Sequence, residues 1–515
     1  MRQLILFLEV ALLSALILAT RCANYQDVLV AGNVYFADAD CYARMTRARL
    51  CAEHPGLIVR HHEFENFPAG TTSHTTAPFD YLILVLSILL KPFTTHALDL
   101  AGALISPLLA LLGAWFLWWW SRGMKFRFRW ALLILYAISP ILVHGTELGR
   151  PDHQSLAVLL VTIGLCAEWA WRSEPKKTWS IFSGAAWGVA IWVSAYEPLI
   201  LLLLVTSVGL VQDRHRLFAK ERQAGWLFFA AIILVAFVIE RRIPSAPIFQ
   251  SSEMFRNWSR TIGELTPVSP LNPVWFRWAG YMIVIAPVLI WLGLRKKTLP
   301  PIFITVLLIA TYCLTIWQAR WSYFFMSIFA IALPGLLEPI KSRAAVWVAV
   351  ALSIFPILRD WDEKLWPNEL ELARRIEHGR ESIDLRELAG MIRSSQTRPF
   401  LAPWWLSPAI AYWSGQPGMA GSSHESLDGI AESARFFLSH DWHEARLILE
   451  NHEVAWIFAY DADRVAENSA ALIGAPALPH SICRSIYRTP GQAPRDLVLS
   501  AQNGTAKLFR FANNR

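Results

Sequence analysis

Carboxylates from three separate segments could together bind a hard divalent cation. Asp38 and Asp40 lie in the run Asp-Ala-Asp-Cys-Tyr-Ala-Arg. Asp152 lies in Gly-Arg-Pro-Asp-His-Gln, and Glu264 ends the run Thr-Ile-Gly-Glu. Mg²⁺ and Mn²⁺ prefer carboxylate oxygens and keep coordination positions open for a phosphate. A convergence of Asp40, Asp152 and Glu264 would therefore form a Mg²⁺ or Mn²⁺ site.

Each of these carboxylates taken alone is typical of a solvated loop or a surface ion pair. Zinc ligands are not indicated, because the cysteines form no Cys-x-x-Cys pair and neither Cys nor His is suitably arranged. A disulfide between Cys41 and Cys51 stays open. A helix between them would hold them about 15 Å apart, too far to bond.

Arg320 and a tryptophan pair are the other candidates. Arg320 lies where one apolar run ends and the next begins. A charge at this level is costly and usually functional, and an Arg here holds a lipid phosphate. The alternative is an Arg that snorkels among interfacial aromatics. Trp404 and Trp405 follow a strand-like run, where such a pair lines a peptide or sugar site or packs in a core.

The composition shows what kind of protein positions these residues. Hydrophobic residues make up 55% and charged residues 17% of the 515 residues, against about 25% charged in soluble domains. Long uncharged runs such as 100–120 have the length of a bilayer core. A soluble, disordered or fibrous protein is excluded. The net charge of +7 sits in short loops between apolar runs, so nucleic-acid binding is not indicated.

We predict a polytopic α-helical membrane protein of about eleven spans, followed by a small external α/β domain. The first run lacks an Ala-x-Ala cleavage pattern, so a retained span is preferred to a signal peptide. The predicted spans are 4–20, 101–120, 130–145, 154–171, 179–195, 197–211, 224–239, 274–294, 298–317, 321–338 and 344–358.

The loops between the predicted spans alternate between basic and almost uncharged. Because Lys and Arg collect on the cytoplasmic side, the N-terminus lies in the cytoplasm and the tail outside. Residues 80–92 are too short a run for a span and form an interfacial or re-entrant helix. The external segments are then 21–100, 144–153 and 240–273, which places the three carboxylate motifs on one side.

Two domains follow from this topology, a transmembrane catalytic domain over 1–358 and an external domain over 359–515. In the second domain, strand-like and helix-like runs alternate, which is typical of an α/β fold. The expected strands are 399–402, 453–460 and 507–511, and the expected helices are 426–439 and 441–450.

The order of the motifs resembles the catalytic subunits of bacterial oligosaccharyltransferases, and more broadly the GT-C glycosyltransferases. Residues 38–44 are similar to the family's Asp-x-Tyr motif, with Tyr42 two residues after Asp40. Asp152-His153-Gln154 stands where the family has Asp-x-Asp or Asp-x-Glu. Residues 261–264 match the bacterial Thr-Ile-x-Glu motif, and the tryptophan pair opens the family's Trp-Trp-Asp-Tyr-Gly.

The resemblance implies an inverting, metal-dependent transfer of a glycan from a polyprenyl (pyro)phosphate to an acceptor, a protein or another glycan. Asp40, with Asp38 as the alternate, would activate the acceptor, and Arg320 would bind the donor phosphate. The implied metal ligands are Asp40, Asp152 and Glu264, the acceptor-binding residues are Trp404 and Trp405, and the supporting residues are Tyr42, Arg44, His153, Gln154 and Thr261. The implied location is the bacterial inner membrane, with the C-terminal domain periplasmic.

The sequence also departs from the family pattern. Leu-Ser-Pro follows the tryptophan pair in place of Asp-Tyr-Gly, so recognition of an Asn-x-Ser/Thr sequon is not implied. Two alternatives stay open. A GT-C enzyme that adds one sugar from a polyprenyl monophosphate would lack an ordered peptide groove at the tryptophans. A transporter of lipid-linked substrates would show broken helices and midplane charges. No oligomeric state is indicated.

Overall fold

The computed structural model describes residues 1–242, 252–296 and 300–512. Residues 243–251 of the third predicted external segment and the first two residues of the predicted span 298–317 lie outside the described residues. The described chain divides into two compact units. We call residues 1–28, 100–242 and 264–369 the helical unit, and residues 29–99, 252–263 and 370–512 the mixed unit.

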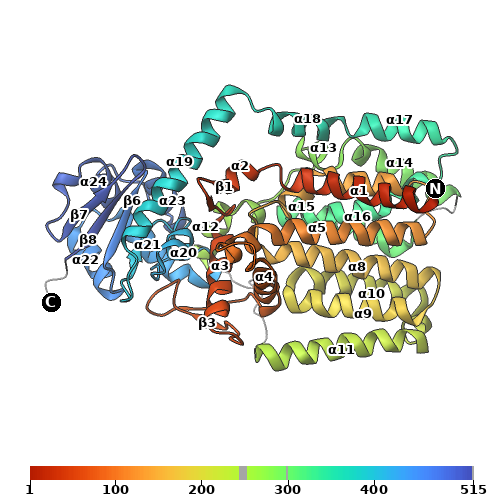
Figure 1. Cartoon of the computed structure of the whole chain (residues 1–515), viewed down its shortest axis with the longest axis horizontal. Helices are drawn as coiled ribbons and strands as arrows, with labels where there is room; N and C mark the ends of the chain where they lie inside the picture. Colours follow the sequence, from red (N-terminus) through yellow and green to blue (C-terminus); the bar gives the residue numbers. More distant parts are fainter. Residues whose placement is uncertain (243–251, 297–299, 513–515) are drawn as a thin grey trace. The chain divides into compact units, whose positions relative to one another are not determined.

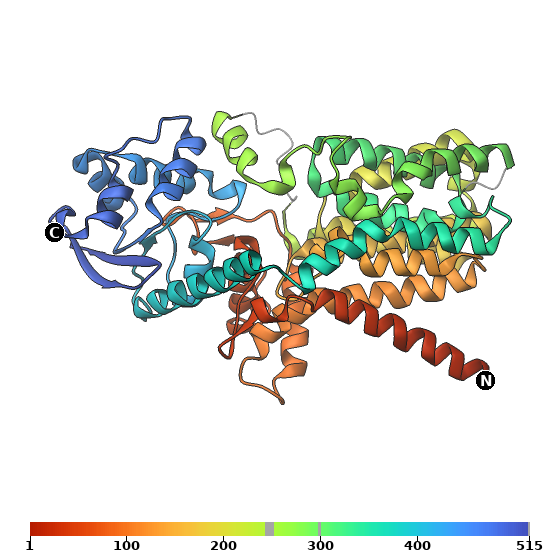
Figure 2. The ribbon, with the colours of Figure 1, turned by 90° about the horizontal axis from the view of Figure 1, so that it is seen from above.

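The helical unit consists of apolar helices joined by short connections (Figure 1). Figure 2 shows α1 at the edge of this helix bundle. The helices are α1 (Arg2–Arg21), α2 (Tyr25–Val28), α5 (Ala97–Gly123), α6 (Arg129–Ile138), α7 (Pro140–His144), α8 (His153–Ser173), α9 (Lys177–Val193), α10 (Tyr196–Leu217), α11 (Lys220–Glu240), α13 (Val274–Ala279), α14 (Met282–Lys296), α15 (Ile302–Trp317), α16 (Ser322–Leu337), α17 (Arg343–Ser353) and α18 (Phe355–Leu365).

Each predicted span falls on a helix or on two helices that meet at a break. Among the described residues, seven helices are long and apolar enough to cross a membrane. The predicted spans 130–145, 179–195, 274–294 and 298–317 fall instead on shorter or interrupted helices. The polytopic helical class is confirmed, whereas the number of about eleven crossings stays a prediction.

The break between α6 and α7 is stabilised by an arginine from α1. Pro140 has no N–H, so the carbonyl of Tyr136 loses its helical partner. Arg21, which is 0% exposed, donates from Nη2 to that carbonyl at 2.9 Å and from Nη1 to the carbonyl of Ala137. Its Nε donates to Thr146 Oγ1 at 3.1 Å. The end of α1 is therefore integrated into the folded unit, and retention of the first span stays a prediction.

Close packing of α9 on α11 depends on small residues. A Cβ on Gly184 would lie 2.0 Å from the carbonyl oxygen of Gly225. Ser180 Oγ donates to the carbonyl of Arg222 and accepts from the N–H of Gly225 at 3.2 Å. Small residues let helix backbones approach in lipid, where apolar burial gives little drive for association.

The mixed unit is built around a four-stranded sheet of order β5-β6-β8-β7. β5 (Phe400–Leu401) runs parallel to β6 (Trp456–Tyr460), and β8 (Ala506–Phe511) pairs antiparallel with β6 and β7 (Leu497–Gln502). Two hairpins lie outside this sheet, β1 (Leu29–Val30) with β2 (Asn33–Val34), and β3 (His61–His62) with β4 (Thr71–Thr72). The helices are α3 (Ala39–Glu53), α4 (Ala77–Leu90), α12 (Glu253–Thr261), α19 (Glu369–Met391), α20 (Ser407–Ser414), α21 (Leu427–Leu438), α22 (Trp442–Asn451), α23 (Ala462–Ile473) and α24 (Ile482–Arg488).

The expected strands and helices of the C-terminal region are confirmed, at β5, β6, β8, α21 and α22. The domain division differs from the expected one. Residues 29–99 belong to the mixed unit rather than to the transmembrane domain, because α3 packs on α20. Arg49 of α3 donates to the carbonyl of Tyr412 at 2.7 Å and lies 3.9 Å from its ring centroid. The predicted domain boundary near residue 359 lies close to the last observed boundary between the two units, which follows residue 369.

A buried ion-pair triad joins α3 to α4. Asp80, which is 0% exposed, accepts from Arg44 at 2.8 Å and from Arg47 at 2.7 Å. Cys41 and Cys51 both lie in α3, are buried and are not joined by a disulfide. The helical spacing explains why they form no disulfide.

Asp80→Asn is expected to destabilise the mixed unit by about 3–5 kcal/mol, because two buried guanidinium groups lose their counter-charge. The buried thiols of Cys41 and Cys51 report the local opening of α3. Their labelling rates, measured by mass spectrometry under native conditions, should rise by at least about a hundredfold.

The control is Glu371→Gln in α19, which breaks an exposed pair with Arg374 at 2.6 Å. Its effect on the same rates should stay within a few-fold. Equal labelling of Asp80→Asn and the wild type would show that the triad does not stabilise α3.

Candidate functional site

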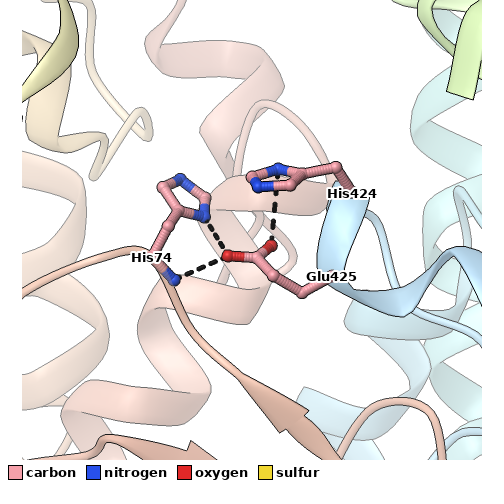
Figure 3. Close-up of side chains that lie close together, drawn as sticks. All are labelled: His74, His424 and Glu425. Atoms are coloured by element: carbon pink, nitrogen blue, oxygen red, sulfur yellow. Dashed lines mark hydrogen bonds and ion pairs between the residues drawn. The ribbon is translucent and has the colours of Figure 1, made fainter. Parts of the chain in front are cut away.

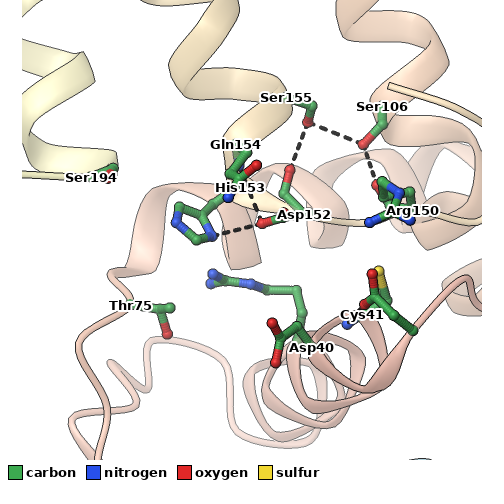
Figure 4. A network of polar contacts seen from close by, with 12 residues as sticks. Asp40, Cys41, Thr75, Ser106, Arg150, Asp152, His153, Gln154, Ser155 and Ser194 are labelled. Atoms are coloured by element: carbon green, nitrogen blue, oxygen red, sulfur yellow. Dashed lines mark hydrogen bonds and ion pairs between the residues drawn. The ribbon is translucent and has the colours of Figure 1, made fainter. Parts of the chain in front are cut away.

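In the helical unit, Asp152 begins α8. Its side chain accepts from the N–H of Gln154 at 3.2 Å, an N-cap interaction that ends the preceding loop. The imidazole of His153 contacts the same carboxylate at 2.8 Å (Figure 4). Ser106 of α5 donates to the carbonyl of Arg150 at 2.5 Å, which anchors the loop against α5. Asp152 is thus held rigidly and is partly exposed.

Glu264 lies in the same polar cluster of the helical unit. It accepts from Gln154 Nε2 at 3.0 Å and from the Tyr323 hydroxyl at 3.1 Å. Burial, together with the charge of Asp152, raises the pKa of Glu264. The carboxylates of Asp152 and Glu264 repel each other and lie beside the amide of Gln154. Their hard oxygen atoms are the ligands that Mg²⁺ and Mn²⁺ prefer.

Arg320 extends this cluster. Its guanidinium pairs with Glu197 at 2.5 Å and lies 5.6 Å from the ring centroid of Tyr196. Its Nε has no hydrogen-bond partner among the described residues. Its positive charge also acts on Glu264 and partly offsets the rise in the pKa of that carboxyl. The interaction with buried Glu197 argues against a snorkelling Arg, and it leaves a buried donor for an anion.

In the mixed unit, Asp38 and Asp40 have different surroundings. Asp38 is the N-cap of α3 and accepts from the N–H of Cys41 at 3.0 Å. Asp40 is exposed in the first turn, and Ser422 donates its hydroxyl to it at 2.6 Å. Tyr42 is buried and accepts from the N–H of Phe36 at 3.1 Å. Asp38 and Tyr42 therefore shape the helix start, while Asp40 is presented to solvent.

The two tryptophans also differ. Trp404 is 8% exposed and donates to Asn468 Oδ1 at 2.8 Å, so it belongs to the core of the mixed unit. Trp405 packs edge-on against it with 5.9 Å between ring centroids. Trp405 is partly exposed, and its Nε1 has no partner among the described residues. Thr261, at the end of α12, donates to the carbonyl of Trp258 at 2.7 Å.

Glu65 is a candidate that sequence reasoning missed. It is 3% exposed, and its Oε2 accepts from Ser426 Oγ at 3.4 Å. Burial, with the charges of Asp40 and Glu425, raises the pKa of Glu65 to about 8. Neither its spacing nor its surroundings in the chain distinguish it from a surface acid, so only the fold identifies it.

A His/Glu group was also missed. His74, His424 and Glu425 have ligand atoms within 4.8 Å of one another (Figure 3). The expectation that no histidines are arranged for zinc is therefore wrong for this group. The residues come from segments far apart in the chain, which spacing rules cannot detect.

The predicted site residues divide between the two units. Asp152, His153, Gln154, Glu264 and Arg320 lie in the helical unit, and the remaining ones lie in the mixed unit. Within the mixed unit, Arg44 serves the buried pair with Asp80 rather than a solvent-facing site. Two residues of the helical group not foreseen from the sequence are Tyr323 and His144, whose Nδ1 lies 2.9 Å from the Tyr323 hydroxyl.

Solved structures with the same fold are membrane glycosyltransferases. The oligosaccharyltransferase of Archaeoglobus fulgidus, tethered to an acceptor peptide with the NVT sequon, has a TM-score of 0.68 at 13% identity, over 90% of this chain and 70% of that chain. The same enzyme complexed with Zn and sulfate has a TM-score of 0.68 at 14% identity, over 98% and 73%. ArnT from Cupriavidus metallidurans, bound to undecaprenyl phosphate, has a TM-score of 0.56 at 14% identity, over 98% and 97%.

A scan against protein-family models finds no match, and neither does a search of curated proteins. At this identity the likeness shows the fold. The chain has the fold of GT-C membrane glycosyltransferases, with a small C-terminal sheet domain. Its apolar helices and its structural neighbours indicate a multi-pass membrane protein.

The raised pKa of Glu65 predicts a pH dependence of stability in metal-free buffer. Below the ordinary value of 4.5 the side chain is protonated in both states. Between 4.5 and about 8 the unfolded state ionises while the folded state stays protonated. Stability is therefore lost as pH rises through this window, by up to about 1.4 kcal/mol per pH unit.

Glu65→Gln should remove this loss, because the amide does not ionise. The ratio of variant to wild-type labelling rates at Cys41 and Cys51 should fall steadily from pH 5 to pH 8. Glu63→Gln, an exposed neighbour, is the matched control and should leave the ratio constant. A constant ratio for Glu65→Gln as well would mean that Glu65 ionises normally.

Proposed function

We propose that this chain is a membrane glycosyltransferase that moves a glycan from a polyprenyl (pyro)phosphate to an acceptor, in the manner of an oligosaccharyltransferase. The observation that carries the proposal is the polar cluster of the helical unit. There Asp152 and Glu264, which suit a divalent cation, lie within electrostatic reach of Arg320. Carboxylates and an arginine among apolar helices suit a donor that joins a charged phosphate to a lipid tail.

Donor binding is assigned to Arg320. Its Nε is a buried donor beside the guanidinium that Glu197 orients. A phosphate oxygen at this position would receive a charge-assisted hydrogen bond. Two structural neighbours support a lipid phosphate: the Archaeoglobus enzyme was solved with a dolichol-phosphate, and ArnT with undecaprenyl phosphate.

Asp152 and Glu264 are proposed to hold the metal, with Asp40 as the third ligand. A bound Mg²⁺ or Mn²⁺ would supply positive charge that stabilises the leaving (pyro)phosphate. The hydrogen bonds from Gln154 and Tyr323 orient Glu264 for this role. The inclusion of Asp40 rests on the order of the motifs in the sequence.

Activation of the acceptor is assigned to Asp40 rather than Asp38. Asp38 already caps α3, whereas Asp40 is exposed and oriented by Ser422. A carboxylate in this position accepts a hydrogen bond or a proton from the attacking group. Arg44 and Tyr42 fix the helix that carries it.

The acceptor is proposed to be a protein. Trp405 offers a partly exposed ring whose Nε1 has no partner among the described residues, and an amphipathic ring of this kind binds a peptide or a sugar. Trp404 supports it from the core. The peptide-bound Archaeoglobus enzyme, which shares this fold, is consistent with such an acceptor.

A second candidate is transfer of a single sugar from a polyprenyl monophosphate. The specific observation in its favour is the likeness to ArnT, which covers 98% of this chain and 97% of that chain.

The broken helices α6–α7 and α13–α14 are a feature expected of the transporter alternative. However, Arg21 donates to the carbonyl of Tyr136 that the first break leaves without a helical partner, so this break is part of the packing of the helical unit. We place the protein in the bacterial inner membrane, with the N-terminus cytoplasmic and the mixed unit periplasmic.

The proposal is tested in proteoliposomes with two defined donors, a polyprenyl-pyrophosphate glycan and a polyprenyl-monophosphate sugar. We expect Mn²⁺-dependent release or transfer of the glycan from the first donor only. Asp40→Asn should lower the rate by about 10²–10⁴-fold, because a positioned acid or base contributes this much.

Asp38→Asn is the matched control. Asn caps a helix about as well as Asp, so this variant should keep the start of α3 and retain most of the rate. Transfer from the monophosphate donor alone would establish the single-sugar alternative. Movement of intact donor across the bilayer, without any bond cleavage, would establish the transporter.

Arg320→Gln is expected to raise the KM for the donor by about tenfold to a hundredfold, the effect of one charged hydrogen bond. The variant must be made together with Glu197→Gln, so that no unpaired buried carboxylate remains. Glu197→Gln alone is the control and should change the KM much less. An unchanged donor KM in the double variant would remove Arg320 from the donor site.

A further inference from the structure

Three metal-ligating side chains of the mixed unit converge although they lie on distant segments. His74 lies between β4 and α4, and His424 and Glu425 form the turn that precedes α21. The backbone N–H of His74 donates to Glu425 Oε1 at 2.6 Å, across 351 residues. His74 Nδ1 contacts the same oxygen, and His424 Nδ1 lies 3.5 Å from Glu425 Oε2 (Figure 3).

The donor set differs from the carboxylate cluster of the helical unit. Two imidazoles and one carboxylate suit Zn²⁺ and other transition ions, whereas Mg²⁺ and Mn²⁺ prefer oxygen alone. The side chains of His424 and Glu425 are 8% and 11% exposed, and that of His74 is 33% exposed. The group is therefore largely buried and accessible from one side.

His424 and Glu425 also line a pocket of ≈ 710 Å³. Its walls include His424, Glu425, Asp428 and Arg435. Three protein ligands and an accessible pocket leave a fourth tetrahedral position for water or an exogenous ligand. A fully closed structural site would have a fourth protein ligand instead.

We propose that His74, His424 and Glu425 bind one Zn²⁺-class ion, separate from the Mg²⁺ or Mn²⁺ site of the proposed transfer reaction. The ion ties the first external segment to the turn at 422–426. Ser422 and Ser426, on either side of the two ligands, donate to Asp40 and Glu65 at 2.6 and 3.4 Å. Metal binding therefore also fixes the turn that orients Asp40.

The site is tested on the full-length protein in detergent, stripped with a chelator and re-equilibrated with Zn²⁺ or Co²⁺. The background variant Asp152→Asn weakens the carboxylate site, so that the remaining metal reports the His/Glu site. We expect one tightly held ion by elemental analysis and a tetrahedral Co²⁺ absorption spectrum. His74→Ala and Glu425→Gln should each lose this ion and this spectrum.

Two matched controls check the assignment. His61→Ala removes an exposed imidazole of the same segment, and Glu432→Gln removes another carboxylate of the same pocket. Both should retain the ion. A metal content that is equal in His74→Ala, Glu425→Gln and the background overturns the proposal, as does equal loss in the controls.

Hydrogen exchange supplies a second readout that does not depend on activity. Zn²⁺ at 100 times its Kd should slow exchange of residues 71–76 and 422–426 by up to about a hundredfold. The slowing should vanish in Glu425→Gln, which keeps the side-chain volume. Because this readout needs no glycan transfer, its failure is distinguishable from failure of the proposed function. Unchanged exchange in wild type overturns the site.

Discussion

Every polar backbone group placed in apolar surroundings needs a partner, and at the end of α6 that partner is Arg21. The break at Pro140 would leave carbonyl groups unpaired, at a cost of a few kcal/mol each. The Arg21 guanidinium donates hydrogen bonds to these carbonyl groups. The backbone carbonyl of Arg21 in turn accepts from the N–H of Leu148 at 2.8 Å. Gly149 then donates to the carbonyl of Ala103 at 3.0 Å. The chain between α7 and α8 is thus fixed from end to end, and Asp152 follows directly from it.

The same need for a partner governs the buried charges of the mixed unit. Asp80 is tolerated because two arginines of α3 contact it, and this fixes α3 against α4. Asp40 stands about one turn before Arg44 and two turns before Arg47 on the same helix. Its position is therefore set by an ion pair in which it takes no part, and its orientation by Ser422 from the C-terminal part of the chain. This explains why the first external segment belongs to the mixed unit.

Much of this arrangement is predictable from the sequence, because membrane helices and capping residues are local signals. Apolar runs located the long helices of the helical unit but not α2, and Asp152 and Asp38 cap helix starts by accepting from the N–H groups of Gln154 and Cys41. The sheet strand β7 was not foreseen, because it is an exposed edge strand with little apolar alternation. Glu65 and the group around Glu425 were not foreseen either, since their chemistry arises from contacts between residues hundreds of positions apart. Sequence spacing carries no information about such contacts.

The acids around Asp40 show how the fold limits negative charge near the carboxylate that we propose to activate the acceptor. Glu65, with its pKa raised to about 8, stays protonated at neutral pH. Glu425 is flanked by His74 and His424, which lower its pKa despite its burial. Glu65 therefore adds no negative charge beside Asp40 at neutral pH, and the charged Glu425 is held against the imidazoles of His74 and His424. A cation at the two histidines would strengthen this balance, because it would neutralise Glu425 without requiring protonated imidazoles. The Zn²⁺-class site and the presentation of Asp40 are in this way two aspects of one electrostatic arrangement.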